Sequence, residues 1–270
     1  MKEGEQVSEP KTGRYTAAGP AAARLMAQHL VMKPYIWSVL NVHLHGMRNL
    51  DGLKAPFVAI ANHSSHLDAP LIMGALPRRL SKNLATATAA DYFFDTWYKA
   101  LPTALFFNSF PVVRQGHQNR RGQRGIAAEL LDEGVPLLIF AEGTRSRTGA
   151  MTSFTPGAAA LSISRNVPIL PIALVGAYAA MPYGATVPVN GRPHVHVIFG
   201  RPLTAAPGEL ARQFSERLHR YVVEMHDTTA RAYGMPTQAD FARAVALRTA
   251  AAAIDQQAAK ARQTPPPDSA

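Results

Sequence analysis

Residues 57–68 of the chain are Phe-Val-Ala-Ile-Ala-Asn-His-Ser-Ser-His-Leu-Asp. The first five form a short apolar run that predicts a buried strand, and Asp68 with Pro70 predicts the first turn of a helix. On a single helix His63 and Asp68 would lie about 140° apart, so they meet only if His63 lies on the loop before the helix. The Asp68 carboxylate could then hold one ring nitrogen while the other faces a cleft. The stretch therefore predicts an oriented general base.

The composition limits the possible classes of protein. A chain of 270 residues is long enough for one large α/β domain. It contains no cysteine, which excludes disulfides, thiolate zinc sites and a cysteine acyl-enzyme. The net charge is +10, from 28 Lys and Arg against 18 Asp and Glu. This excess suits nucleic acid, an anionic bilayer or a phosphorylated substrate, and it does not choose among them.

Strand-like and helix-like stretches alternate through the middle of the chain. Apolar runs predict strands at 57–61, 83–88, 106–113, 135–140, 169–175 and 194–199. Amphipathic or alanine-rich stretches predict helices from 68, and at 91–101, 120–132, 156–165, 207–233 and 237–262. Such alternation predicts an α/β fold with a mainly parallel central sheet flanked by helices, with a helical N-terminal extension and a helical C-terminal tail.

Three regions are expected along the chain. Residues 1–49 are interpreted as a loose start followed by helices over 21–49, broken near Pro34, that either pack on the core or lie in a membrane surface. Residues 50–233 are expected to form the catalytic domain, and 234–270 a helical tail with a disordered end. The first residues do not resemble a signal peptide, and no run of 18 apolar residues occurs. We therefore expect a cytoplasmic protein, associated peripherally with the inner face of the membrane.

A second informative stretch, residues 140–147, is Phe-Ala-Glu-Gly-Thr-Arg-Ser-Arg and follows a predicted strand. A turn through Gly143 would expose backbone N–H groups beside arginines, which suits a phosphate. Alternatively, Glu142 pairs with Arg145 and holds the loop. Arg114 follows another predicted strand. Because the carboxyl ends of parallel strands share one edge of a sheet, His63, Arg114 and Arg145 are expected to converge.

These stretches and the segment Val167-Pro168-Ile169-Leu170-Pro171-Ile172 occur in the order of four sequence blocks. Over residues 50–205 the chain resembles the glycerolipid acyltransferase family, the PlsC-like 1-acyl-glycerol-3-phosphate acyltransferases. It departs from the family pattern at three positions. Asn108 stands where the second block usually has glycine, Pro111 replaces its aromatic residue, and Ala141 stands where the third block usually has proline.

The resemblance implies acyl transfer from acyl-CoA or acyl-carrier protein to a hydroxyl of lysophosphatidate or glycerol-3-phosphate. It implies no cofactor and no metal, since the acyl carrier is a co-substrate. His63 and Asp68 are the implied catalytic pair, and N–H groups near His63 or Gly143 are candidate oxyanion donors. The implied substrate-binding residues are Asn62, Arg114, Glu142, Gly143, Thr144 and Arg145.

Other interpretations remain open at this point. The chain could be a non-catalytic basic module that binds anionic lipid or nucleic acid, or an acyltransferase acting on another lipid hydroxyl. His63, His66 and Asp68 could ligate a metal, although no further closely spaced ligand completes the set. No compact run of Lys and Arg with aromatic residues occurs, so the expected partners are the acyl carrier, the phosphorylated glycerol and an anionic membrane surface, without nucleic acid.

Overall fold

The computed structural model describes residues 13–89, 106–112 and 120–263. In these ranges the strands form one sheet in the order β1-β7-β6-β2-β5-β3-β4. Neighbouring strands are parallel except β6 and β7, which are antiparallel. The strands are β1 (Asn41–His45), β2 (Val58–Ala61), β3 (Ala85–Ala89), β4 (Phe110–Val112), β5 (Leu137–Phe140), β6 (Ile169–Val175) and β7 (His194–Phe199). The predicted α/β fold with a mainly parallel sheet is confirmed.

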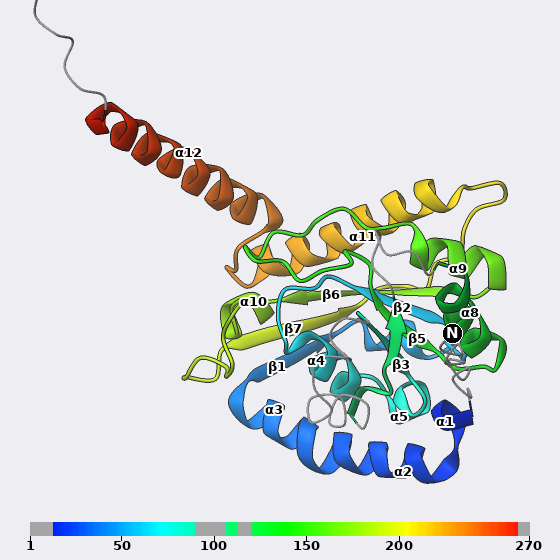
Figure 1. Cartoon of the computed structure of the whole chain (residues 1–270). Coiled ribbons are helices and arrows are strands. Elements are labelled where there is room, and N and C mark those ends of the chain that lie inside the picture. Colours follow the sequence, from blue (N-terminus) through cyan, green and yellow to red (C-terminus); the bar gives the residue numbers. More distant parts are fainter. Residues whose placement is uncertain (1–12, 90–105, 113–119, 264–270) are drawn as a thin grey trace, which may run out of the picture.

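Helices cover both faces of the sheet (Figure 1). One layer holds α2 (Ala18–Met26), α3 (Lys33–Val39), α4 (Asp68–Ala75) and α5 (Arg78–Ser81). The other layer holds α8 (Arg120–Asp132), α9 (Gly157–Arg165) and α11 (Ala211–Ala232). The remaining elements are α1 (Gly13–Thr16), the π-helical η1 (Ala27–Met32), the 3-10 helix η2 (Met47–Leu50), α10 (Ala177–Ala180) and α12 (Gln238–Gln263).

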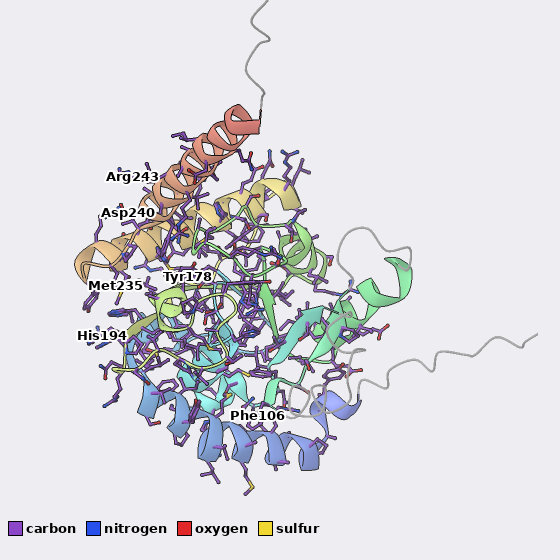
Figure 2. All side chains as sticks on the ribbon, turned by 60° about the vertical axis from the view of Figure 1, so that its left-hand side comes forward. Phe106, Tyr178, His194, Met235, Asp240 and Arg243 are labelled. Atoms are coloured by element: carbon purple, nitrogen blue, oxygen red, sulfur yellow. The ribbon has the colours of Figure 1, made fainter. Side chains whose placement is uncertain are left out.

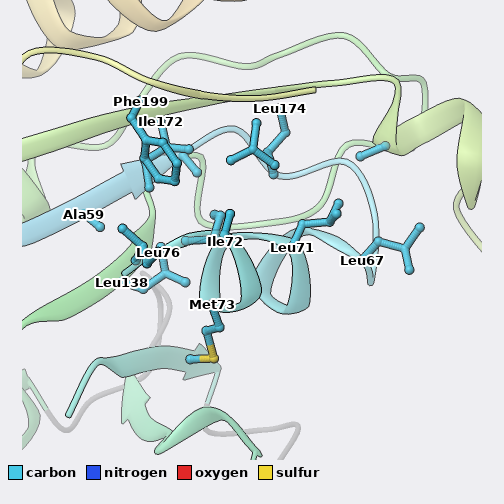
Figure 3. Close-up of a cluster of buried hydrophobic side chains, with 14 of the residues drawn as sticks. Ala59, Leu67, Leu71, Ile72, Met73, Leu76, Leu138, Ile172, Leu174 and Phe199 are labelled. Carbon is cyan, nitrogen blue, oxygen red and sulfur yellow. The ribbon is translucent and has the colours of Figure 1, made fainter. Parts of the chain in front are cut away.

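The period-2 geometry of β2 divides the core between these two layers. Ala59 and Ala61 contact the cluster beneath α3 and α4, whereas Val58 and Ile60 contact the cluster under α8, α9 and α11. Figure 3 shows Leu71 and Ile72 of α4 directed toward the sheet. Both side chains are fully buried, and each such burial stabilises the fold by about 1.5–3 kcal/mol. The central strands are therefore covered on both faces, as a parallel sheet requires.

The predicted helical region 21–49 is wrong in two respects. Residues 41–45 form strand β1, which pairs in parallel with β7 and places His43 opposite His196. This partner lies about 150 residues later, so tertiary pairing overrides the local pattern. The helix is also unbroken at Pro34, because α2, η1 and α3 follow one another directly. Pro34 lies in the first turn of α3, where proline is tolerated.

The other predicted elements occur where expected, with ends that differ by a few residues. The strand expected over 106–113 is limited to Phe110–Val112, at the edge of the sheet, where Pro111 is acceptable because no further strand needs its missing N–H. The helix expected over 91–101 lies outside the described residues. The proposed division at residues 49 and 233 stays a prediction.

Two C-terminal helices complete the chain. α11 packs against β6 and α9, whereas α12 leaves the body of the molecule after its first turns (Figure 1). Leu247 and Ile254 of α12 are about two-thirds exposed. In the part of the chain that the structure describes, no helix has both the length and the hydropathy to cross a membrane.

Candidate active site

His63 and Asp68 meet at the carboxyl edge of the sheet. β2 ends at Ala61 and α4 begins at Asp68, so His63 lies on the connecting loop. His63 Nδ1 lies 2.8 Å from Asp68 Oδ2, and the same oxygen accepts the N–H groups of Ser64 at 2.7 Å and Ser65 at 2.8 Å. Asp68 is fully buried, and its place in the first turn of α4 favours a negative charge. The geometry needed for an oriented general base is present.

The hydrogen bonds assign the proton on the imidazole. Asp68 Oδ2 already accepts two backbone N–H groups, so the third partner, His63 Nδ1, is the donor. Nε2 is then the unprotonated nitrogen, and no hydrogen bond in the described ranges occupies it. Phe140, the last residue of β5, stacks on the ring with centroids 3.9 Å apart. The His63 side chain is 21% exposed, so part of the ring is accessible from solvent.

Asn62 and Glu142 hold the loop that carries His63. The Asn62 amide exchanges two hydrogen bonds with the backbone of Leu174 on β6, at 2.8 and 3.0 Å. Glu142 Oε1 accepts the His63 N–H at 2.7 Å, and Oε2 accepts the N–H and hydroxyl of Thr152 at 2.8 and 3.0 Å. Both side chains are buried. Their contacts are those of positioning residues, and substrate binding by either stays a prediction.

The loop after β5 presents two arginines beside the base. Gly143 adopts a φ of +76° and donates its N–H to Phe140, which makes a turn that glycine adopts without strain. Ser146 donates its N–H to the His63 carbonyl at 2.8 Å, which ties this loop to the His63 loop.

The guanidinium groups of Arg145 and Arg147 both lie over the ring of Tyr183, at 5.1 and 5.2 Å from its centroid. Neither pairs with a carboxylate among the described residues. Unpaired guanidinium groups of this kind suit a phosphate. Thr144 is exposed in the same loop.

The pKa shifts agree with this crowded arrangement. Burial raises the pKa of Glu142, and the hydrogen bonds from Thr152 and His63 oppose that rise. The pKa of His66 is lowered, first by desolvation and then by the nearby charges of Arg145 and His63. Arg145 is therefore close enough to His66 to act on it electrostatically. No set of three or more His, Asp or Glu side chains in the described ranges is placed to hold a metal ion.

The backbone donors proposed for an oxyanion are largely engaged. The N–H groups of His63, Ser64, Ser65 and Gly143 already donate to protein acceptors. Any of them that served an oxyanion would first have to leave its present acceptor.

The second block lies partly beyond the described residues, and Arg114 is among the residues that the structure does not describe. Asn108, which stands where the family usually has glycine, is described. It adopts a φ of +46°, a left-handed conformation that asparagine tolerates better than other residues with a side chain. Its amide also accepts a hydrogen bond from the buried Arg24 at 2.9 Å. The departure from glycine therefore keeps the backbone conformation.

Three contributors to the site are absent from the sequence-based prediction. Phe140 could be found from strand register, because it lies opposite Ala61 and so close to His63. Thr152 and Tyr183 carry no local signal, since each reaches the site through the path of a long loop.

The fold and site define an α/β protein with an oriented histidine beside unpaired arginines. A family model described as "Acyltransferase" matches residues 41–175, half of the chain. The chain therefore belongs to the acyltransferase family, as its four sequence blocks predict.

Curated proteins and one solved structure are similar to this chain. The chain is 25% identical over 178 residues to the chloroplastic 1-acyl-sn-glycerol-3-phosphate acyltransferase of Arabidopsis thaliana, covering 65% of this chain and 47% of the relative. It is 29% identical over 163 residues to the human 1-acyl-sn-glycerol-3-phosphate acyltransferase alpha, covering 56% and 50%. The crystal structure of the LPA acyltransferase PlsC from Thermotoga maritima superposes with a TM-score of 0.58 at 21% identity, covering 74% of this chain and 77% of that one. The chain spans about half the length of the curated relatives it matches.

Proposed function

We propose that this protein transfers an acyl group from a thioester donor to a hydroxyl of lysophosphatidate, in phospholipid synthesis. The observation that carries the proposal is the His63–Asp68 hydrogen bond of 2.8 Å, on a loop that the Ser146 N–H ties to the loop of Arg145 and Arg147. The names of the curated relatives, 1-acyl-sn-glycerol-3-phosphate acyltransferases, support the same reaction class. Glycerol-3-phosphate is the second acceptor that fits the same phosphate-binding chemistry.

In the proposed mechanism His63 is a general base. The acceptor oxygen attacks the thioester carbonyl carbon while its proton passes to Nε2. The C–O bond forms, the C–S bond breaks, and the imidazolium returns the proton to the leaving thiolate. Asp68 stabilises the imidazolium and keeps its Nδ1 oriented. General-base catalysis of this kind accelerates such reactions about 10²–10⁴-fold.

Arg145 and Arg147 are the proposed phosphate ligands. Both guanidinium groups lie over the Tyr183 ring, and such cation–π contacts favour this placement before an anion binds. Arg114 is proposed as a further ligand on the basis of the sequence pattern alone. The donor is proposed to be acyl-CoA or acyl-carrier protein, used as a co-substrate without a cofactor.

The N-terminal helices are proposed to contact an anionic membrane surface. Along α2, η1 and α3 the outward-facing side chains Met26, Leu30, Val31 and Tyr35 are 52–67% exposed. An exposed apolar row on a continuous helix is typical of helices that lie in a membrane interface. The lipid acceptor would then reach the site from the bilayer, and a location on the cytoplasmic face remains part of the proposal.

The decisive experiment measures thiol release from acyl-CoA, and separately from acyl-carrier protein, in the presence of lysophosphatidate. Release by the wild-type protein that His63→Ala lowers at least 100-fold, with binding to anionic vesicles retained, supports the proposal. His194→Ala is the matched control, because His194 is an exposed histidine at the start of β7, which β6 separates from β2. Undiminished release by His63→Ala would remove the histidine from the mechanism. An absence of release by the wild type, with vesicles still bound, would favour the non-catalytic lipid-binding function.

A further inference from the structure

The first turns of α12 are fastened onto the loop that carries the arginines. Thr237 and Asp240 cap this helix reciprocally, with the Thr237 N–H and hydroxyl both donating to Asp240 Oδ2 at 2.9 and 2.7 Å. Gln238 follows Thr237 in the chain. Its side-chain Oε1 accepts the Met151 N–H at 2.6 Å, and its backbone N–H donates to Asp227 of α11 at 2.8 Å. One residue therefore joins α11, α12 and the site loop.

A second contact holds the same helix turn in place. Phe241 packs edge-on against Tyr178 of α10, with ring centroids 5.9 Å apart. It also covers Gly149, where an added Cβ would lie 2.5 Å from the Phe241 ring. Figure 2 shows Asp240 and Arg243 on the first turns of α12, on the same side of the molecule as Tyr178. α12 lies beyond the residues 41–175 that match the family, so this contact is a feature of this chain's C-terminal region.

Between α12 and the loop lies a groove of about 550 Å³. Residues 144–148, Ala150 and Thr152 line one side, and Ala242 and Val245 line the other. The loop side thus includes the basic residues Arg145 and Arg147, and the opposite side is aliphatic. A groove with this division suits an amphiphile whose anionic group is joined closely to an apolar chain.

We propose that Ala242 and Val245 of α12 bind the acyl chain of the acceptor lysophosphatidate and so determine its selection over acceptors without a chain. This inference rests on the proposed function. It adds a specificity-determining wall that faces the loop whose Ser146 N–H donates to the His63 carbonyl. The phosphate binds Arg145 and Arg147, and the chain leaves the glycerol along the aliphatic wall.

The size of the groove supports a chain in addition to the phosphorylated glycerol. Glycerol-3-phosphate has ten non-hydrogen atoms, which fill at most about 300 Å³ at the ~30 Å³ that one water molecule occupies. More than 200 Å³ of the groove of about 550 Å³ then remains for a chain. The acceptor is the better occupant than the donor. Its chain and phosphate share one glycerol, whereas a pantetheine arm separates the acyl group from the phosphate in the donor.

The test is equilibrium binding of hexanoyl-lysophosphatidate and of glycerol-3-phosphate, without donor, to the full chain. Val245→Asn removes apolar contact without adding a charge that would pair with the arginines, and Val245→Trp fills the groove. We expect each variant to raise the Kd for hexanoyl-lysophosphatidate about ten-fold, the effect of losing one to two buried methylene groups. The Kd for glycerol-3-phosphate should stay within about two-fold, since its contacts are with the loop.

Leu247→Asn is the matched control, because it makes the same kind of change on the same helix at a side chain that is 65% exposed. It should alter neither Kd. Equal changes in both Kd values, or none in either, in the two Val245 variants would overturn the proposed wall. This test and the test of the proposed function can fail separately. If the wild-type protein bound lysophosphatidate selectively through Val245 but released no thiol from a donor, the proposed wall would be supported and the proposed acyl transfer would be rejected.

Discussion

Glu142→Gln tests whether the Glu142 carboxylate positions the loop that carries His63 or binds the substrate. In the structure its two oxygens accept three hydrogen bonds, from the His63 N–H and from the N–H and hydroxyl of Thr152. Glutamine keeps the shape but replaces one acceptor oxygen by an NH₂ group. The Thr152 hydroxyl can turn and accept from that group, whereas a backbone N–H cannot. In either orientation of the amide, one buried N–H of His63 or Thr152 loses its acceptor.

The loss of one hydrogen-bond acceptor sets the expected decrease in the free energy of unfolding. An unsatisfied buried N–H costs about 1–3 kcal/mol. Burial raises the pKa of Glu142, so the charged carboxylate itself is partly desolvated, and the neutral amide avoids that cost. We therefore expect the free energy of unfolding to fall by about 1–2 kcal/mol. The backbone of His63 shifts with it, and a misplacement of about 1 Å lowers a rate by about 100-fold. The expected result is a large loss of kcat with little change in the KM for lysophosphatidate.

Urea denaturation and thiol-release kinetics on the same preparations measure both quantities. Glu216→Gln is the control, because Glu216 forms an exposed ion pair within α11 and its loss should change stability by less than about 0.5 kcal/mol. If Glu142→Gln left the free energy of unfolding and kcat unchanged and raised only the KM for the acceptor, the positioning role would be refuted. Glu142 would then bind the glycerol, as the sequence pattern predicts.

Three further predictions concern other parts of the molecule. Asp68→Asn should lower kcat about 10²–10⁴-fold, because the amide cannot stabilise the imidazolium, and steady-state kinetics would measure this. Burial, followed by the charges of neighbouring histidines, lowers the pKa of His196 to about 4, so the unfolded chain binds this proton first as the pH falls. The free energy of unfolding should therefore decrease from about pH 6.5 to about pH 4, and less steeply in His196→Phe; equal slopes in urea denaturation would contradict this. Leu30→Asp should weaken flotation with anionic vesicles, whereas Leu247→Asp, at a similarly exposed leucine, should not; equal losses would argue against an N-terminal membrane contact.

The sequence predicts the parts of the structure that depend on neighbouring residues. The apolar run of β2, the acidic start of α4 and their spacing are local, so the meeting of His63 and Asp68 follows from one short stretch. The same holds for β6, where all seven residues are buried and apolar or proline. These patterns give the order of strands and helices, and with it the edge of the sheet where the site lies.

Contacts between distant residues account for what the sequence does not predict. β1 forms because β7 offers an edge, not because Asn41–His45 has a distinctive pattern. The amide of Asn62, an implied substrate-binding residue, hydrogen-bonds to Leu174, 112 residues away, and substrate binding by Asn62 stays a prediction. Glu142 likewise finds Thr152 only through the path of a loop. Asn62 and Glu142 are polar side chains of sequence motifs, and their hydrogen-bond partners cannot be predicted from local spacing.

The contacts around His63 imply that chemistry and selectivity reside in separate parts of this protein. Asp68 and Phe140 contact the imidazole, and Glu142 and the Ser146 N–H hold the backbone of His63. All four residues lie within the stretch that matches the family. A base held in this way is already oriented before substrate binds, which is what preorganised catalysis requires. The groove wall on α12, Ala242 and Val245, lies outside that stretch. Changes at the wall should therefore alter which acceptor binds while leaving the intrinsic reactivity of the base unchanged.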